Sequence, residues 1–255
     1  MKGLVRHIPN TLTCLNLIFG FYAAMSGLTG NYFCAMTAIL LAAVFDFSDG
    51  LAARLLKAYS ALGKELDSLA DVISFGVAPG MMLFSYLDKL SENLSWNDSI
   101  ACKCLLFTSF AIPVFSAIRL AKFNIDDRQT TSFIGLPVPA HAIFWSSLIT
   151  VLAADTHASW CILPQIARLL SSINPEIMIF ILSASALATS LLLTSRIRLF
   201  SLKISTLSWK ANRPVYLLLA AALLLILFFG ILGITATILL YILLSLIFSI
   251  AISPL

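Results

Sequence analysis

The sequence predicts an all-α membrane protein, a polytopic bundle of about eight transmembrane helices. Of its 255 residues, 60% are hydrophobic and only 11% are charged, with 16 Lys and Arg against 12 Asp and Glu. A soluble domain carries about 25% charged residues, and so few charges could not cover a soluble surface. Disorder is excluded as well, because disordered chains combine low hydrophobicity with high charge. The apolar residues gather in runs long enough to span a bilayer, which indicates the class.

The apolar runs give the helices in chain order. They cover residues 11–29, 32–53, 68–87, 99–118, 135–154, 175–195, 214–232 and 234–252. The first run contains Asn16 and no clear small-residue cleavage site, so we expect it to be retained as a helix. The last two runs are separate spans, because a single uncharged helix over 214–255 would be about 63 Å long, roughly twice the hydrocarbon thickness. Gly230 and Gly233 mark the turn between them.

The basic residues orient these helices. If the N-terminus is cytoplasmic, 13 of the 16 Lys and Arg fall on the cytoplasmic side, and only Lys89, Lys103 and Arg168 fall on the other. Cytoplasmic segments of membrane proteins carry an excess of Lys and Arg. We therefore expect both termini in the cytoplasm.

Four aspartates stand within or beside the second and third runs. Asp46 and Asp49 end one run, and Asp67 and Asp71 open the next. A carboxylate is costly in the hydrocarbon region, so these residues are candidates for a functional site. Spacings of three and four residues place each pair on one helix face. Both pairs lie on the cytoplasmic side, so we expect them to face each other.

Cations would relieve the repulsion between four converging carboxylates. Such oxygen ligands suit Mg²⁺, Mn²⁺ or Ca²⁺ rather than zinc, and a pair of these ions can clamp a phosphoryl group during displacement. The intervening residues fit a phosphate ligand. Gly50 and Ala53 leave a helix face bare, Arg54 can bind phosphate bidentately, and Ser60 and Gly63 offer a hydroxyl and a flexible backbone in the connection. The alternative, a charged loop with Asp67 as a helix cap, leaves the other three aspartates unexplained.

The pattern Asp46-x2-Asp49-Gly50-x2-Ala53-Arg54-x8-Gly63-x3-Asp67-x3-Asp71 resembles the signature of the CDP-alcohol phosphatidyltransferases, and every position of that signature is filled. The resemblance implies a membrane enzyme with a core of six helices, in which an alcohol displaces CMP from a CDP-linked lipid beside two metal ions. It implies that the four aspartates are metal ligands and that Asp71 is also the general base. It further implies contacts to CDP-diacylglycerol from Pro9, Asn10, Thr11, Gly50, Ala53, Arg54, Ser60 and Gly63.

Segments outside the signature indicate the acceptor. Residues 8–21, 118–124, 133–140 and 195–203 resemble the bacterial phosphatidylserine synthases of this family. That likeness implies L-serine as acceptor, CDP-diacylglycerol as donor and two Mg²⁺ or Mn²⁺ ions as cofactors. It also implies a homodimer in the bacterial cytoplasmic membrane with its site facing the cytoplasm. Residues 1–210 would form the catalytic domain, and residues 211–255 two additional helices.

Serine needs a cation for its carboxylate and acceptors for its ammonium. The candidates are Arg119, Lys122, Asn124 and Arg196. Anchoring to lipid phosphates is the alternative role of Arg119 and Arg196.

Other functions stay open at this point. The same site could serve glycerol 3-phosphate or inositol phosphate, although a phosphorylated acceptor needs further cations. A cation transporter can also contain intramembrane aspartates, but here they cluster toward one membrane face beside Arg54. A structural scaffold would not need them. We expect no nucleic-acid partner.

Overall fold

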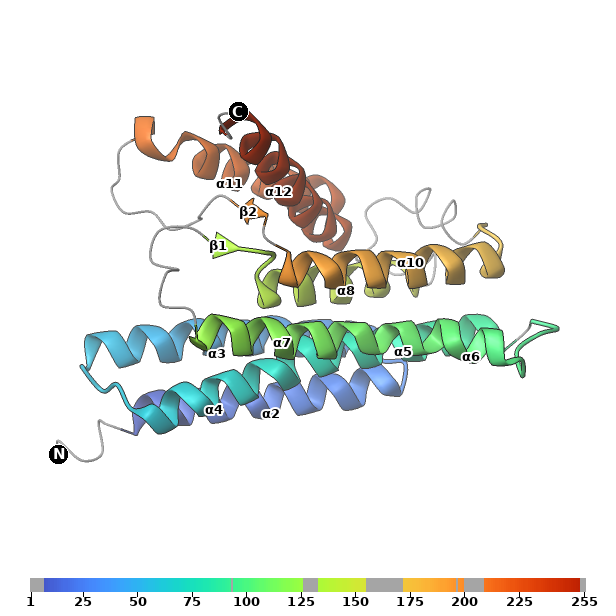
Figure 1. Cartoon of the computed structure of the whole chain (residues 1–255), viewed down its shortest axis with the longest axis horizontal. Coiled ribbons are helices and arrows are strands. Elements are labelled where there is room, and N and C mark those ends of the chain that lie inside the picture. The colour runs from blue at the N-terminus through green and yellow to red at the C-terminus, as the bar shows by residue number, and fades with distance from the viewer. Residues whose placement is uncertain are drawn as a thin grey trace.

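The computed structural model describes residues 7–92, 94–125, 133–154, 172–195, 197–199 and 209–252. The long elements in these ranges are helices, most of which run side by side along the longest axis of the molecule (Figure 1). Within these ranges, five helical spans are long and apolar enough to cross a membrane: Ile8–Leu28, Tyr32–Leu55, Ala61–Ser91, Ile100–Ile125 and Pro175–Thr194. The shorter apolar helices of the described residues are Val138–Leu152, Val215–Phe229 and Ile231–Ser245. Together they match the eight predicted spans.

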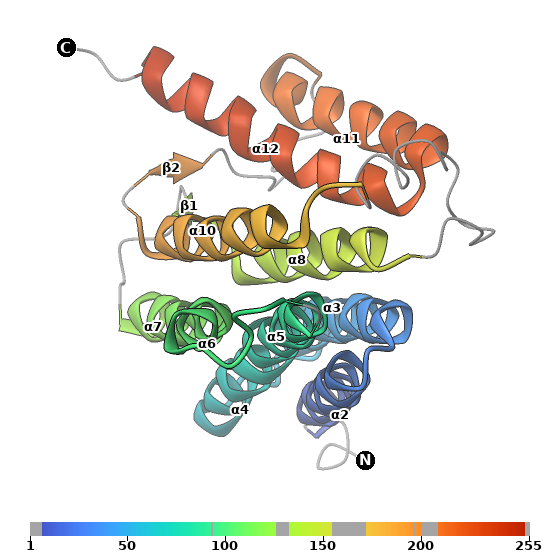
Figure 2. The ribbon, with the colours of Figure 1, turned by 90° about the vertical axis from the view of Figure 1, so that its right-hand side faces the viewer.

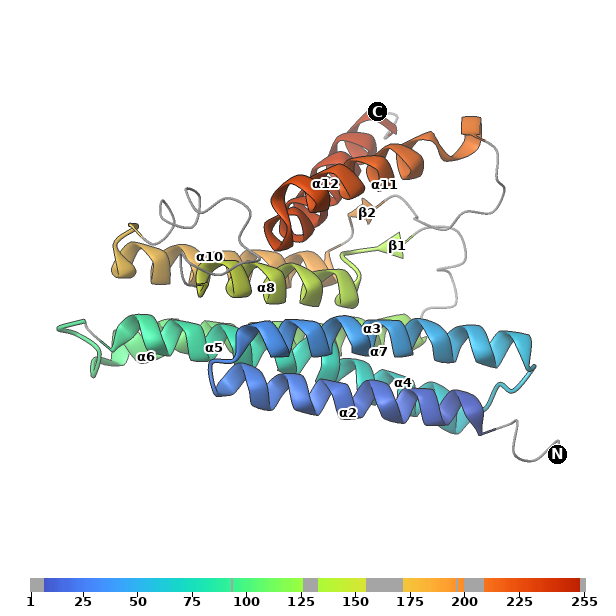
Figure 3. The same ribbon diagram turned by 180° about the vertical axis from the view of Figure 1, so that it is seen from behind.

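The first half of the chain forms two tiers of the bundle. Seen end on, α2 and α4 lie in the lowest tier, with α3, α5, α6 and α7 above them (Figure 2). Figure 3, seen from behind, shows α2 alongside α3. The elements of this half are α2 (Ile8–Leu28), α3 (Tyr32–Leu55), α4 (Ala61–Asp71), the π-helix η1 (Val72–Val77), α5 (Ala78–Ser91), α6 (Ile100–Phe107), the 3₁₀ turn η2 (Thr108–Phe110) and α7 (Ala111–Ile125).

The second half of the chain covers the side of α3, α5, α6 and α7 that faces away from α2 and α4 (Figure 2). Helices α8 (Val138–Leu152) and α10 (Pro175–Thr194) lie over α3 and α7, and α11 (Trp209–Phe229) and α12 (Ile231–Ile252) lie above them (Figure 2). Among the described residues, the small departure from an all-α fold is a pair of two-residue antiparallel strands, β1 (Phe133–Ile134) and β2 (Arg198–Leu199).

The last two helices form a hairpin, as predicted, but only one of the two expected glycines makes its turn. Gly230 lies between α11 and α12 with a φ of 57°, a conformation that glycine adopts without strain. Gly233 lies inside α12, where an added Cβ would collide with the backbone of Leu225. Gly233 therefore permits the close packing of the two helices.

Small residues also bring α7 close to the rod formed by η1 and α5. A Cβ on Gly80 would lie 2.9 Å from Cδ of Pro113, and one on Gly76 would lie 3.2 Å from Cβ of Ser116. Glycines four residues apart allow helix backbones to approach closely inside a membrane. This contact fixes α7 against the helix that carries two of the aspartates.

The third span begins earlier than its apolar run. Ser60 caps α4, because its Oγ accepts a hydrogen bond from the Gly63 amide at 3.0 Å. Ser60 is therefore a helix cap, and Gly63 lies in the first turn rather than in a free connection. Asp67 lies inside α4 and is not a cap.

Candidate active site

Helices α3 and α4 bring the aspartates together. One carboxylate oxygen from each of Asp46, Asp49 and Asp67 lies within 4.8 Å of the others. The Asp46 carboxyl also contacts that of Asp71, one turn beyond Asp67 on α4. Asp49 is 5% exposed and Asp71 is 8% exposed. The two pairs thus face each other, as their spacing predicted.

Helix α2 contacts both aspartate-bearing helices at this point. Thr13 Oγ1 donates a hydrogen bond to Asp49 Oδ2 at 2.6 Å, and Asn16 Nδ2 donates to Asp71 Oδ1 at 3.2 Å. Ser74, in η1, donates to the backbone carbonyl of Asn16 at 3.0 Å. One carboxylate of each pair is therefore held by a side chain of α2.

The π-helix begins directly after Asp71. Pro79 gives a physical reason for it, because proline cannot donate to the carbonyl four residues earlier and its ring crowds that carbonyl. The wider turns place Ser74 against Gly20 of α2, where an added Cβ would lie 2.8 Å from the Ser74 Cα. π-turns inside helices occur frequently at functional sites.

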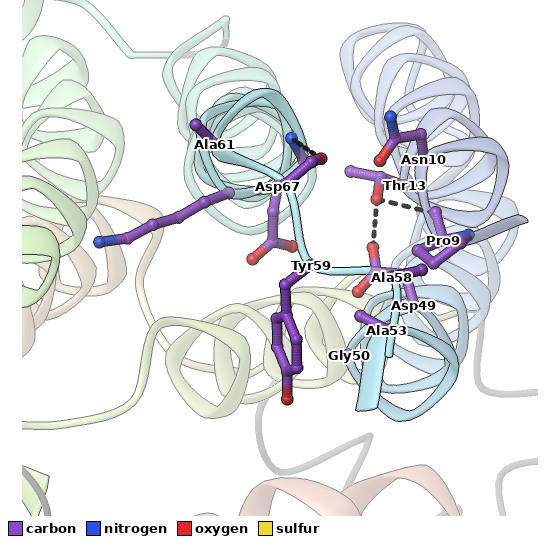
Figure 4. A pocket seen from close by; sticks show the side chains of 13 residues that line it. Pro9, Asn10, Thr13, Asp49, Gly50, Ala53, Ala58, Tyr59, Ala61 and Asp67 are labelled. Atoms are coloured by element: carbon purple, nitrogen blue, oxygen red, sulfur yellow. Dashed lines mark hydrogen bonds between the residues drawn. The ribbon is translucent and has the colours of Figure 1, made fainter. Parts of the chain in front are cut away.

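A cavity of about 510 Å³ opens beside the carboxylates, within the size range of small-molecule sites. Figure 4 shows Thr13 and Asp49 joined by a hydrogen bond, with Asp67 on the neighbouring helix. Gly50 leaves one wall bare, since a Cβ there would meet nothing within 4 Å. The lining residues are Pro9, Asn10, Thr13, Asp49, Gly50, Ala53, Ala58, Tyr59, Ser60, Ala61, Gly63, Lys64 and Asp67.

The carboxylates suit a divalent cation. Asp67 Oδ1 is buried without a hydrogen-bond partner in the described part of the chain. No Lys or Arg among the described residues pairs with any of the four aspartates. Buried, uncompensated carboxylate oxygens are the ligands that Mg²⁺ and Mn²⁺ prefer. The cluster can therefore hold a metal ion.

Comparison with known families accounts for this arrangement. The family model described as CDP-alcohol phosphatidyltransferase matches residues 6–173, which contain the aspartates and the cavity. The chain belongs to the CDP-alcohol phosphatidyltransferase family. It is thus a member of a family of membrane enzymes, in agreement with its apolar helices.

Several curated relatives carry the same name, CDP-diacylglycerol–serine O-phosphatidyltransferase. That of Bacillus subtilis (strain 168) is 38% identical over 135 residues, 53% of this chain and 71% of the relative. That of Helicobacter pylori (strain ATCC 700392 / 26695) is 33% identical over 137 residues, 53% of this chain and 54% of the relative. That of Methanocaldococcus jannaschii is 36% identical over 137 residues, 53% of this chain and 57% of the relative. The chain thus spans little more than half the length of the last two.

The family resemblance implied eight CDP contacts, of which two lie outside the cavity lining. The six that line it are Pro9, Asn10, Gly50, Ala53, Ser60 and Gly63. Thr11 is exposed and donates to the His7 carbonyl at 3.0 Å. Arg54 is exposed, and its Nε donates to the Gly50 carbonyl at 3.0 Å. Thr13, two residues beyond Thr11 and so about 200° further around α2, faces the aspartates instead.

Of the described basic residues that were predicted to bind serine, Arg119 is buried and Lys122 is exposed. Arg119 is 8% exposed, and its Nε has no hydrogen-bond partner in the described chain. Tyr241 of α12 lies within electrostatic range of the guanidinium. Arg119 does not line the cavity at the aspartates, so its contact with serine stays a prediction.

Lys122 and Asn124 lie near the end of α7, also outside the cavity lining. Lys122 is exposed. The side-chain amide of Asn124 donates to Ser68 Oγ at 2.7 Å, and the backbone carbonyl of Asn124 accepts from Lys64 Nζ at 3.2 Å, so Asn124 joins α7 to α4. Arg196 lies outside the described residues.

Four polar residues that line the cavity or hydrogen-bond to its aspartates escaped the sequence prediction. Thr13 and Asn16 are missing from the signature, although a buried stripe of Pro9, Thr13, Asn16 and Gly20 follows helical spacing. Tyr59 and Lys64 line the cavity, and Tyr59 is 68% exposed at its edge. The signature leaves their positions open, so only an amphipathic-face analysis of α2 could have found the first two.

Proposed function

We propose that this protein transfers the phosphatidyl group of CDP-diacylglycerol to the hydroxyl of L-serine, which yields phosphatidylserine and CMP. The observation that carries the proposal is the convergence of Asp46, Asp49 and Asp67 beside the cavity, with Asp71 against Asp46. The name that these relatives share, CDP-diacylglycerol–serine O-phosphatidyltransferase, supports serine as the acceptor.

The bare wall of the cavity admits the nucleotide. Gly50 and Ala53 present no large side chain to the CDP group, and Asn10 and Ser60 offer polar atoms on the facing elements. The lipid chains stay among the exposed apolar side chains of the bundle. The headgroup can then reach the carboxylates while the acyl chains remain in the bilayer.

The aspartates supply the chemistry. Asp46, Asp49, Asp67 and Asp71 would hold two divalent cations, Mg²⁺ or Mn²⁺, which when bound draw charge from the diphosphate and stabilise the departing CMP. Serine Oγ forms a bond to the phosphorus that carries diacylglycerol, and the bond from that phosphorus to CMP breaks. Asp71 accepts the proton of the serine hydroxyl. Its rate contribution comes from its fixed position beside the reacting groups.

The distribution of charge supports a site that faces the cytoplasm. Arg54 in the last turn of α3, Lys64 early in α4 and Lys122 in the last turn of α7 share one end of the bundle, and Lys89 of α5 belongs to the other (Figure 1). An excess of Lys and Arg marks the cytoplasmic side. We place the protein in the cytoplasmic membrane of a bacterium and expect a homodimer, as the family resemblance implies.

A panel of acceptors tests the function. Purified protein receives labelled CDP-diacylglycerol and Mn²⁺ with L-serine, glycerol 3-phosphate or inositol phosphate, and CMP and the lipid product are measured. Phosphatidylserine formed with serine, and no product with the other two, is the expected result. Turnover with a phosphorylated acceptor alone would assign the same site to a different reaction. Folded protein that uses no acceptor would contradict the proposal.

A further inference from the structure

Helix α2 contributes no aspartate, yet it contacts both aspartate pairs. Thr13 and Asn16 are three residues apart and so share one face of the helix. Thr13 is 2% exposed and Asn16 is fully buried. Each donates to an aspartate of a different pair, Thr13 to Asp49 of α3 and Asn16 to Asp71 of α4.

The hydroxyl of Thr13 has one proton and two acceptors within reach. The Pro9 carbonyl lies 3.1 Å from Oγ1, and Asp49 Oδ2 lies 2.6 Å from it. A charged acceptor at the shorter distance forms the stronger bond. The proton therefore goes to Asp49 and fixes the rotation of that carboxylate.

The amide of Asn16 is oriented by Asp71. An ionised carboxylate can only accept hydrogen bonds, so the amide nitrogen must face it. This orientation leaves Asn16 Oδ1 buried without a partner in the described chain, which costs free energy. The backbone of Asn16 is held by Ser74, whose side chain fits against Gly20. The packing of α2 against η1 thus orients the Asn16 amide nitrogen toward the Asp71 carboxylate and leaves the Asn16 side-chain oxygen without a hydrogen bond in the described chain.

We propose that Thr13 and Asn16 are positioning residues of the metal site. Each occupies one oxygen of an aspartate and fixes the rotation of that carboxylate relative to the other ligands. Outer hydrogen bonds of this kind orient metal ligands, and their loss typically lowers metal affinity by about 10- to 100-fold. The inference rests on the proposed function only in that the aspartates bind divalent cations.

Binding of Mn²⁺ to the full-length protein in detergent tests the proposal without substrate. The variants Thr13→Val and Asn16→Leu remove the donors with little change in volume, and we expect each to weaken Mn²⁺ binding by about 10- to 100-fold. Thr13→Ser keeps the donor and should restore binding. The matched control is Thr150→Val, because Thr150 is also buried but donates to the carbonyls of Tyr32 and Ser146.

A kinetic split adds a readout that a general loss of stability would not give. The Mn²⁺ concentration for half-maximal CMP release should rise in Thr13→Val and Asn16→Leu, while the KM for the acceptor stays unchanged. The melting temperature of each variant checks that it folds. If one of the two variants does not fold, the other still tests the proposal. Wild-type Mn²⁺ affinity in both variants would overturn the proposal, as would an equal loss in Thr150→Val or no Mn²⁺ binding by the wild type. Failure of serine as acceptor leaves the Mn²⁺ measurement unaffected, so the two failures are distinguishable.

Discussion

Arg54 belongs to the signature but turns its side chain back along its own helix. Its Nε donates to the carbonyl of Gly50, the residue that leaves the cavity wall bare. The guanidinium has four further N–H donors, and the side chain is exposed at the end of α3. A diphosphate over Gly50 would lie along the same helix face, one turn away.

Arg54→Gln should therefore weaken the binding of CDP-diacylglycerol, the phosphatidyl donor, and leave the binding of serine unchanged. The lost charge-assisted hydrogen bonds to phosphate predict a KM for CDP-diacylglycerol raised by about tenfold or more, with the KM for serine unchanged. Steady-state kinetics in mixed micelles measure both. Lys57→Gln is the control, because it removes another exposed positive charge three residues later. The same change in both variants would reduce Arg54 to a general electrostatic role.

The aspartates could be predicted at residue scale, and their hydrogen-bond partners could not. Asp46 and Asp49 stand out because a charge at the end of an apolar run is costly. Thr13 and Asn16 carry no charge, and such residues are common in membrane helices because they bond to their own backbone or to neighbours. Whether they face the carboxylates depends on the rotation of α2, which packing of Gly20 against Ser74 sets.

At the scale of elements, glycines decide how closely helices approach and where the cavity lies. Gly20 and Gly50 differ in the space that surrounds them. A Cβ at Gly20 would meet the backbone of η1, whereas one at Gly50 would point into the cavity. Apolar periodicity could not predict the π-helix. The sequence feature that indicates it is Pro79, and proline is equally compatible with a simple kink.

Paired alanine substitutions separate these two roles. Gly20→Ala should lower the melting temperature of the purified protein, because α2 must move away from Ser74. Gly50→Ala should leave the melting temperature unchanged and raise the KM for CDP-diacylglycerol, because the methyl group narrows the cavity. Thermal unfolding and steady-state kinetics on both variants check the pair. A destabilised Gly50→Ala protein with normal substrate affinity would contradict this assignment.

At the scale of the whole molecule, the site lies among α2, α3 and α4 at one end of the bundle. The hairpin of α11 and α12 lies on the side of the bundle away from α2 and α4 (Figure 2). Helix α12 packs on α8, where Ser147 and Thr235 share a buried hydrogen bond of 2.8 Å. The same helix brings Tyr241 within electrostatic range of Arg119. The hydropathy of the sequence predicted the two helices, but it could not predict these contacts, which join residues 88 or more positions apart.

Cysteine labelling tests the orientation of the bundle. In a chain without its native cysteines, Lys57→Cys in the α3–α4 connection should react with a membrane-impermeant thiol reagent only after the cytoplasmic membrane is opened. Glu92→Cys, at the end of α5, should react in intact cells. Both native side chains are exposed, so access to the reagent differs only by membrane side. The reverse pattern would place the active site outside the cytoplasm.

The most direct test of the central claim is serine-dependent CMP release by the wild type and by Asp71→Asn. Purified protein is given CDP-diacylglycerol and Mg²⁺ or Mn²⁺, with and without L-serine, and Asp88→Asn serves as the control because Asp88 is an exposed carboxylate on α5. We predict phosphatidylserine and CMP from the wild type and from Asp88→Asn only when serine is present, and none from folded Asp71→Asn. Serine-independent release, or full activity of Asp71→Asn, would contradict the account.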